Sequence, residues 1–416
     1  MSEIALIDLF AGAGGLTEGF LRNDYEFVSH VEMDVNAIRT LETRCLYHYL
    51  KRDGNSDDYS AYLMNEITRD ELFEEHPEFN RDLYMNLELT EGNKNCVIEC
   101  IKSKMEVLGF ESVDGIIGGP PCQAYSYAGR ARKNMTNDRR NYLYLIYLSF
   151  LKEFRPEFFV FENVPGMISA KKGLILSDFQ EKVINLGYNL DVKIRDASDF
   201  GVPQRRKRLI VIGHRLEMDG EINFEKHRYS GNVWDLLSDL PPLEPGEGYD
   251  GPQHYAGKPA QPLKESGIRT DGDMLLHHQA RNHNSRDREI YRRVIEAWES
   301  ERRRLKYTEL PPELRTHRNT SSFLDRYKVV AGDLPFSHTL VAHISKDGHY
   351  YIHPDRKQAR SLTVREAARI QSFPDSYIFE GSRTSKYQQI GNAVPPLMSE
   401  RIARRIHEIL RGVSDL

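Results

Sequence analysis

The chain has 416 residues, of which 39% are hydrophobic and 29% charged, a composition typical of a globular protein with room for one large and one smaller domain. No stretch reaches the roughly 18 apolar residues that cross a bilayer. No basic segment precedes the first apolar run, so neither a secretion signal nor a membrane anchor is expected and a cytoplasmic location is the default. The net charge of −5 does not by itself indicate a nucleic-acid partner.

Short apolar runs alternate with helical patterns through the first half of the chain. Strands are expected at 4–10, 27–31, 113–117, 158–161 and 209–213, and helices at 18–22, 35–49 and 142–154. This alternation predicts an α/β fold, with a parallel sheet between two layers of helices and a ligand beyond the carboxyl ends of its strands. Glycine-rich or polar segments at 11–15, 118–124 and 162–165 follow three of these strands and would meet at that edge. Residues 50–95 are polar and acidic and look like an insertion.

Beyond residue 215 the alternation is lost, which indicates a second, smaller domain. Residues 238–270 are rich in proline and glycine and favour loops, whereas charged helices are expected at 286–306 and 361–371 and an amphipathic helix at 397–411. Charge is also segregated along the chain. Residues 53–111 hold 15 acidic and 5 basic side chains, while residues 281–330 hold 13 basic and 8 acidic ones. The basic stretch is either a solvated surface or a contact for an anionic partner.

The four cysteines are too few for a disulfide scaffold. Cys96 and Cys100 stand four residues apart with no neighbouring histidine, so helix packing is favoured over a metal site, and no metal is expected. Cys122 is different, because it follows two prolines at the predicted end of a strand, in the segment GGPPCQ. A stiffened turn that presents a thiol at a sheet edge suits a nucleophile, although an isolated cysteine more often only packs.

Three further segments carry polar groups at predicted strand ends. The segment DLFAGAGG at 8–15 is followed about 20 residues later by Glu32, a spacing that suits a ribose-containing ligand, although glycine turns often bind nothing and Glu32 also suits a helix N-terminus. Glu162 would have a raised pKa beside a thiolate in a desolvated site and would then donate a proton, or it caps a helix. The arginine run at 205–208 suits phosphate or a base carbonyl, or a solvated face.

Together and in this order, the segments DLFAGAGG, GGPPCQ, FENV, QRRKR and IGNAVPP resemble the cytosine-C5 DNA methyltransferase family, as found in bacterial restriction–modification systems. The similarity covers residues 1–214 and about 355–410 well and the middle of the chain poorly. It implies a Rossmann-like fold that binds S-adenosylmethionine. One segment departs from the pattern, because the family's Asp-Ile pair has only Glu66-Ile67 as its counterpart, inside the acidic insertion.

The resemblance also assigns residues. The catalytic set would be Cys122, Glu162, Asn163 and Arg206, with Arg206 holding the base O2. The cofactor set would be Phe10, Ala11, Gly12, Gly14, Gly15, Glu32, Met33, Glu66, Ile67, Pro121, Gln123, Leu143, Asn392, Ala393 and Val394. Candidate DNA contacts are Ser126, Arg130, Arg132, Arg205, Arg318, Thr320, Ser321 and Arg326.

The implied reaction begins with attack of the Cys122 thiolate on C6 of a cytosine that has been extruded from the duplex, followed by methyl transfer to C5. Residues 1–215 would form the catalytic domain, 216–384 the target-recognition domain, and 385–416 a segment that returns to the first. We expect a monomer that acts on double-stranded DNA at the prokaryotic nucleoid, with a functional link to a restriction endonuclease. The alternatives are a tRNA cytosine methyltransferase of the same fold, whose Cys-Phe-Thr segment is absent here, and a non-catalytic DNA-binding regulator.

Overall fold

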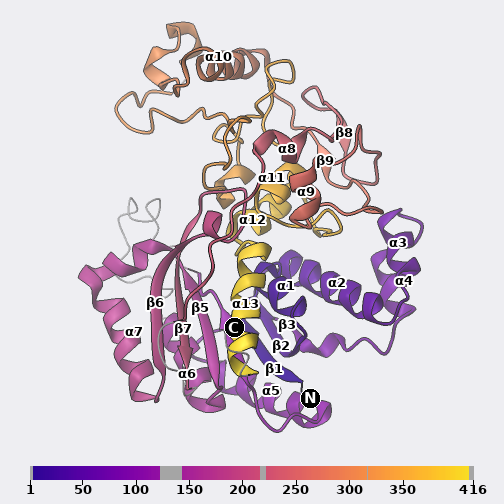
Figure 1. Ribbon diagram of the computed structural model, residues 1–416, viewed down its shortest axis with the longest axis vertical. Helices are drawn as coiled ribbons and strands as arrows, with labels where there is room; N and C mark the ends of the chain where they lie inside the picture. Colours follow the sequence, from indigo (N-terminus) through magenta and orange to yellow (C-terminus); the bar gives the residue numbers. More distant parts are fainter. Residues whose placement is uncertain (1–2, 122–142, 216–221, 316, 412–416) are drawn as a thin grey trace.

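The computed structural model describes residues 3–121, 143–215, 222–315 and 317–411. Its centre is a seven-stranded sheet in the order β3-β2-β1-β4-β5-β7-β6 (Figure 1). The strands are β1 (Ile4–Leu9), β2 (Tyr25–Glu32), β3 (Tyr84–Asn86), β4 (Gly115–Gly118), β5 (Phe158–Asn163), β6 (Asn189–Asp196) and β7 (Lys207–His214).

The sheet is mixed, so the expectation of a parallel sheet was wrong for one strand, β7. Strands β3, β2, β1, β4 and β5 run parallel, but β7 lies antiparallel between β5 and β6. Only the short turn η5 (Ala197–Asp199) is helical between β6 and β7, and a parallel connection needs a longer crossover. Strand β6 was not predicted, although the alternation of polar and apolar residues along this edge strand was an available strand signal.

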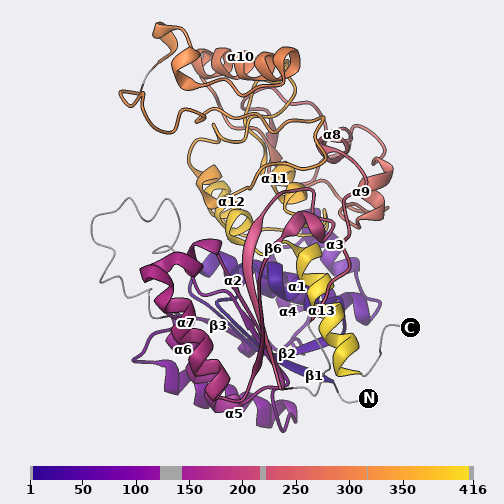
Figure 2. The same cartoon turned by 60° about the vertical axis from the view of Figure 1, so that its left-hand side comes forward.

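Helices cover both faces of the sheet (Figure 2). One face packs against α5 (Lys94–Leu108), α6 (Leu143–Phe154) and α7 (Leu174–Asn185), which is preceded by η4 (Pro165–Gly173). The other packs against α1 (Gly15–Leu21) and α13 (Pro396–Leu410). Gly19 makes this last pair close, because a Cβ there would lie 2.2 Å from the backbone nitrogen of Glu400. The cysteines at 96 and 100 do not pack as expected, since both are exposed on α5.

The acidic insertion is largely helical. Helix α2 (Val35–Arg52) runs out from the sheet, and α3 (Asp57–Leu63) and α4 (Arg69–Glu74) form a small cluster with its outer end, in which Leu46, Tyr59 and Phe73 are buried. The chain then returns through η1 (Arg81–Leu83) to β3, which pairs with β2. The stretch 50–95 therefore supplies an edge strand of the sheet as well as an outer cluster.

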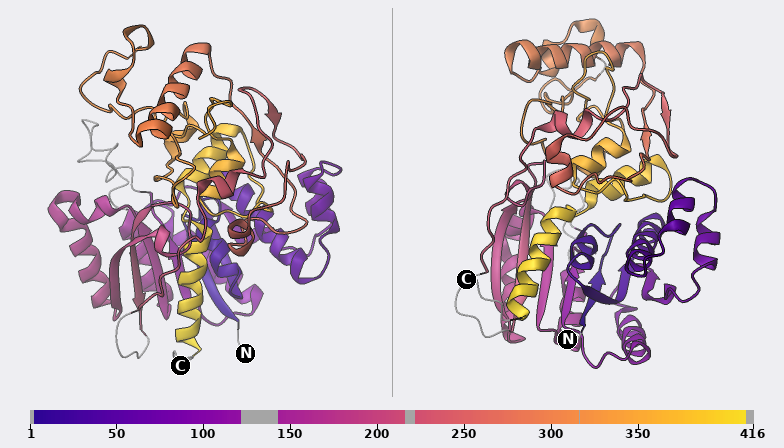
Figure 3. Two further views of the ribbon diagram at one scale, coloured as in Figure 1. Left: turned by 45° about the horizontal axis from the view of Figure 1, so that its top comes forward. Right: turned by 45° about the vertical axis from the view of Figure 1, so that its right-hand side comes forward.

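The second half of the chain has little regular structure (Figure 3). It contains α8 (Val233–Leu237), β8 (Gly248–Tyr249), α9 (Gln261–Glu265), β9 (His278–Gln279), α10 (Ser285–Glu301), η6 (Tyr307–Glu309), η7 (Pro312–Leu314), η8 (Ala342–Ser345), α11 (Val364–Ile370) and α12 (Arg383–Asn392). One hydrophobic cluster joins α8, α11 and α12, and a second surrounds α10. No helix in the described ranges is both long and apolar enough to cross a membrane.

Buried charges hold the first of these clusters together. Arg369 on α11 is fully buried and pairs with Asp375 and with Asp239, which comes from the loop after α8. Arg360 pairs in the same way with Glu366. Thr363 is the N-cap of α11, and its hydroxyl accepts the backbone N–H of Glu366. These ion pairs connect loops that have few backbone hydrogen bonds of the β-sheet type.

Candidate active site at the carboxyl edge of the sheet

Four predicted segments meet at one edge of the sheet, as expected for strands that run in the same direction. Leu9 at the end of β1 pairs with Val31 on β2 and with Gly118 on β4, and Gly118 in turn pairs with Phe161 on β5. The residues that follow these positions therefore lie side by side. They are the glycine turn 10–15, Glu32 and Met33, the turn 119–121, and Glu162 with Asn163.

The glycine turn adopts a conformation that glycine favours. Gly12 and Gly14 have φ angles of 58° and 83°, and Phe10, which is not a glycine, is also left-handed with φ 59°. A Cβ on Gly12 would meet no atom within 4 Å, so this backbone faces open space. Gly14 and Gly15 are instead packed from below, because a Cβ on Gly15 would lie 2.3 Å from the carbonyl oxygen of Val394. Only the first part of the turn is therefore open to a ligand.

Glu32 connects β2 to this turn. Its Oε2 accepts the Gly12 backbone N–H at 2.8 Å, and its Oε1 accepts the Asp34 N–H at 2.8 Å. Burial raises the pKa of Glu32, and these two backbone donors act against the rise. Each carboxylate oxygen retains an acceptor site for a further donor. The next residue, Met33, is 59% exposed, which is unusual for an apolar side chain beside a polar edge.

Glu162 lies at the end of β5 against the turn that leads to Cys122. A Cβ on Gly119 would be 2.7 Å from Glu162 Oε2, so the carboxylate rests on glycine backbone three residues before the cysteine. Burial raises the pKa of Glu162, while the charges of Arg208 and Arg206 oppose that rise. The result is a carboxyl that holds its proton more tightly than one in water.

Arg208 pairs with this carboxylate, with Nε 2.8 Å from Glu162 Oε1. The register explains the contact: Glu162 stands opposite Ile210 in the antiparallel pair, so Arg208 is its diagonal neighbour on the same face. The resemblance assigned Arg206 to the catalytic set, but the strand register brings Arg208 to Glu162.

Arg206 is fully buried, and its guanidinium donates hydrogen bonds to backbone carbonyls. It donates to Leu340 O at 2.5 Å, to Gly391 O at 3.0 Å and to Ala393 O at 2.9 Å. These carbonyls belong to the loop before η8 and to the C-terminal end of α12. In the structure the Arg206 side chain therefore joins the two halves of the chain, and Arg208 is the arginine that lies beside Glu162.

Asn163 connects the carboxyl edge to the cysteine segment. Its Nδ2 donates to Pro120 O at 3.4 Å, and its Oδ1 accepts the Val164 N–H at 2.8 Å. Because the side chain is buried, these contacts fix the turn from 119 to 121 against the end of β5. Pro121 ends the described part of this segment and Leu143 begins the next. Cys122, Gln123, Ser126, Arg130 and Arg132 lie outside the described residues.

The structure separates the other predicted cofactor residues into groups. Ala11 is buried against Ile38 and Leu41 of α2. Asn392 ends α12 and is exposed, and Ala393 and Val394 follow it beneath the glycine turn. The first three residues of the segment IGNAVPP belong to α12. The turn begins only at Ala393.

Glu66 and Ile67 are not brought to the sheet edge. They lie between α3 and α4, where Ile67 packs on the outer cluster. The strand beside β2 is β3, and its last residue, Asn86, is the partner of Glu32. Asn86 Nδ2 donates to the carbonyl oxygens of Glu32 and Met33 at 3.0 and 3.1 Å. The residues after β3, rather than those at 66–67, therefore lie beside the carboxyl end of β2.

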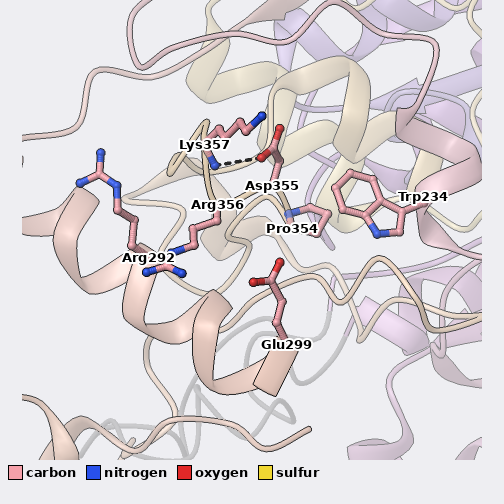
Figure 4. Close-up of a pocket in the computed structure, with 7 residues that line it drawn as sticks. All are labelled: Trp234, Arg292, Glu299, Pro354, Asp355, Arg356 and Lys357. Carbon is pink, nitrogen blue, oxygen red and sulfur yellow. Dashed lines mark hydrogen bonds between the residues drawn. The ribbon is translucent and has the colours of Figure 1, made fainter. Parts of the chain in front are cut away.

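Four of the predicted DNA contacts, Arg318, Thr320, Ser321 and Arg326, lie in the second half of the molecule. Arg205 is exposed just before β7. Arg318, Thr320 and Ser321 are exposed on one loop, whereas Arg326 folds back onto the same loop. None of these residues lines either of two hollows in the surface. One of about 470 Å³ is lined by Trp234, Arg292 and Lys357 among others (Figure 4), and one of about 770 Å³ lies between α7 and β6.

Comparison with known proteins places this geometry in a family. The sequence profile of the C-5 cytosine-specific DNA methylases matches residues 90–408, which is more than half of the chain. The chain belongs to this family. It is a DNA cytosine-5 methyltransferase, and enzymes of this kind take their methyl group from S-adenosylmethionine.

Relatives match this methyltransferase along nearly its whole length. A type II methyltransferase of Bacillus paralicheniformis is 43% identical over 98% of the chain and 99% of the relative. Another, of Desulfomicrobium norvegicum, is 31% identical over 96% of the chain and 88% of the relative. Among solved structures, a prophage-encoded E. coli protein described as a DNA modification methyltransferase has a TM-score of 0.65 at 24% identity, covering 98% and 100% of the two chains. This last similarity concerns the fold alone, and it confirms the expected Rossmann-like methyltransferase architecture.

Proposed function

We propose that this methyltransferase transfers a methyl group to C5 of cytosine at a specific sequence in duplex DNA, through a covalent bond between Cys122 and C6 of the base. The observation that carries the proposal is the position of Glu162. Its carboxylate rests on Gly119, in the same turn that leads to Cys122, and it is paired with Arg208. An acid with a raised pKa and a guanidinium therefore stand together beside the segment that holds the thiol.

These two side chains match two neighbouring atoms of cytosine. Protonated Glu162 is suited to donate to N3, and the Arg208 guanidinium beside it is suited to hold O2. Glu162 must carry its proton at neutral pH to do this, and burial at the end of β5 favours that state. Asn163 acts as a positioning residue, because it fixes the turn that precedes the cysteine.

The Cys122 thiolate forms a bond to C6, and N3 takes the proton from Glu162, so that C5 gains the electron density of an enamine carbon. Bound S-adenosylmethionine would supply the electrophilic methyl group to C5 and would be left as S-adenosylhomocysteine, whose sulfur keeps the electron pair of the broken bond. A base, for which water suffices, then removes the C5 proton. The resulting electron pair breaks the C6–S bond and releases the thiolate, and the N3 proton returns to the Glu162 carboxylate.

The described residues at the sheet edge fit S-adenosylmethionine. The open backbone at Gly12 allows close approach of the ligand, and the oxygens of Glu32 can accept the hydroxyl groups of a ribose. The exposed side chain of Met33 offers an apolar surface to an adenine ring. We assign Phe10, Gly12, Glu32 and Met33 to this cofactor, with the residues after β3 in place of Glu66 and Ile67.

A base that is still paired in a duplex cannot reach Glu162, whose side chain is only 13% exposed. The proposal therefore includes extrusion of the target cytosine into the edge of the sheet. We further propose that residues 216–384 read the DNA sequence and that the protein works as a monomer near the nucleoid of a prokaryotic cell. Because its relatives are type II methyltransferases, a restriction endonuclease of the same specificity is its expected functional partner.

The test is methyl transfer from labelled S-adenosylmethionine to duplex DNA and, in parallel, to tRNA. We expect transfer to DNA alone, abolished by Cys122→Ser, and a complex with 5-fluorocytosine DNA that survives denaturation, because fluorine cannot leave as a proton does. Transfer to tRNA alone would replace the DNA substrate, and loss of transfer to both would leave only a binding role. Bisulfite sequencing of the modified DNA gives the recognised sequence.

A further inference from the structure

The loop formed by residues 317–326, called here the 317–326 loop, is held by Tyr307, a residue of the hydrophobic cluster around α10. The Tyr307 backbone N–H donates to Leu324 O at 2.6 Å, and the Tyr307 hydroxyl accepts the His317 N–H at 2.5 Å. Tyr307 is itself 1% exposed and packs in the hydrophobic cluster that includes Ile290 and Val294 of α10. Two positions of the loop are therefore tied to one buried residue, through its backbone N–H and its side-chain hydroxyl.

Hydrogen bonds within the loop hold its shape. Asn319 Oδ1 accepts the backbone N–H groups of Ser321 and Ser322 at 3.1 and 3.0 Å. Arg326 donates from Nη2 to Asn319 O and Ser322 O at 2.8 and 3.1 Å, and from Nε to Phe323 O at 3.0 Å. Its guanidinium carbon lies 3.9 Å from the centre of the Tyr307 ring. Arg326, which the sequence suggested as a DNA contact, thus organises the loop instead.

Phe323 is the exposed aromatic residue of this loop. Its side chain is 69% exposed, and its φ of 54° places a bulky residue in the left-handed region that such residues avoid. Backbone strain of this kind clusters at functional sites, so an exposed aromatic ring on a strained backbone is a candidate contact with another molecule. In the part of the chain that the structure describes, Phe323 is among the most exposed large apolar side chains, and the carbonyl contact from Arg326 fixes the backbone that presents it.

The surroundings of the loop are strongly basic. Residues 302–328 contain 8 basic and 3 acidic side chains. Arg302 and Arg303 are neutralised by Asp333 and Glu309. Asp325 lies 3.9 Å from Lys328, whereas no described acid lies within ion-pair distance of Arg304. Burial and the charge of Arg304 both lower the pKa of Lys328, as expected of cations that lack enough counter-charge.

We propose that the 317–326 loop enters a groove of the DNA substrate, where the Phe323 ring contacts base edges and the Arg304–Lys328 pair holds a backbone phosphate. This inference rests on the proposed DNA methylation. An aromatic ring can contact a thymine methyl group in the major groove and so read sequence. A phosphate contact adds affinity that does not depend on sequence. The loop lies over the half of the molecule that contains β6 and α7 in both views, well beyond the sheet (Figures 1 and 2).

The experiment measures equilibrium binding by fluorescence anisotropy, with S-adenosylhomocysteine present, at several salt concentrations. The probes are a duplex with the methylated sequence found by bisulfite sequencing and duplexes with one base pair of it changed. Phe323→Ala should weaken binding to the first probe about tenfold and reduce discrimination, with the salt dependence unchanged. Arg304→Gln should weaken binding to all probes alike and lower the salt slope by about one.

Two matched variants serve as controls. Val107→Ala removes an 83% exposed apolar side chain on α5, and Arg303→Gln removes a cation that already has acidic partners, so both should bind as the wild type does. Because Phe323 is exposed, Phe323→Ala should keep the wild-type melting temperature. If the wild type methylates DNA but Phe323→Ala binds and discriminates as well as it does, the loop inference is overturned and the function stands. If the wild type transfers no methyl group to DNA, the proposed function fails instead.

Discussion

Replacing Arg206 by methionine should test whether this arginine is structural while its neighbour Arg208 is functional. The change removes the donor of three hydrogen bonds and leaves the carbonyls of Leu340 and Gly391 without it, whereas Ala393 O keeps the Gln371 Nε2 donor at 2.8 Å. Each orphaned acceptor costs about 1–3 kcal/mol. Burial lowers the pKa of Arg206 well below its usual range, so removal of the buried cation returns part of this cost. We expect a net loss of about 3 kcal/mol, against the 5–15 kcal/mol that stabilises a typical domain.

The matched change, Arg208→Met, should behave in the opposite way. Loss of the guanidinium raises the pKa of Glu162 further, and the carboxyl escapes an unpaired buried charge by keeping its proton. The stability cost should therefore stay below about 1 kcal/mol, while the methyl transfer rate falls by about a hundredfold or more, as when a preorganised donor is removed from a developing charge.

Urea unfolding followed by tryptophan fluorescence gives the first quantity, and single-turnover transfer of labelled methyl groups gives the second. Single-turnover rates are needed because product release can limit kcat. The reasoning is refuted if Arg206→Met is within 0.5 kcal/mol of the wild type, a margin about the size of a neutral surface change. It is equally refuted if Arg208→Met keeps full activity, since the pairing with Glu162 would then be incidental.

Three further outcomes are expected. Gly119→Ala places a Cβ 2.7 Å from Glu162 Oε2, and the flexible carboxylate can avoid this contact by moving. The rate of methyl transfer should therefore fall about a hundredfold, with little change in the urea midpoint of unfolding. The control Gly92→Ala, whose Cβ meets only Thr90 Oγ1 at 3.8 Å, should be neutral in both assays. Glu162→Gln mimics the protonated acid. Because the pKa of Glu162 is raised in the folded protein, the wild type loses stability as the pH rises from the ordinary carboxyl pKa of 4.5 toward the pKa in the folded state. The variant should therefore have the larger free energy of unfolding at pH 8, the difference should disappear near pH 4, and a difference that grows toward acid pH would contradict the assignment. Glu32→Gln weakens the acceptors of the Gly12 and Asp34 N–H groups and should raise the Kd for S-adenosylhomocysteine about tenfold by calorimetry; an unchanged Kd would remove Glu32 from the cofactor site.

The sequence predicted the strands that carry the site because each is a short, fully buried apolar run. Strands β1, β4 and β5 are of this kind, and the polar residues after them were correctly expected at one edge. The direction of β7 was missed, since a strand's own residues do not reveal it. The absence of a helical pattern between 197 and 206 was the available signal, because a parallel crossover needs such a helix.

The side chains of the site were predictable only as far as local pattern reaches. Glu162 follows directly from its place after an apolar strand. The choice between Arg206 and Arg208 depends on which of them meets the carbonyls of Leu340 and Gly391, and these come from segments more than a hundred residues away. The edge strand β3 was hidden for a similar reason: three residues in an acidic stretch become a strand only because β2 offers them a partner.

The packing of α13 against α1 has a consequence for synthesis of the protein. The hydrophobic cluster that includes Leu6, Phe20 and Val160 is completed in part by Met398 and Ile402, which the ribosome adds almost four hundred residues after β1. Until then this apolar cluster lacks its cover, and a chain released early would expose it to aggregation or to chaperones. Completion of the cluster therefore waits for α13, and a nascent fragment with every residue of the carboxyl edge should still be unable to form a stable enzyme.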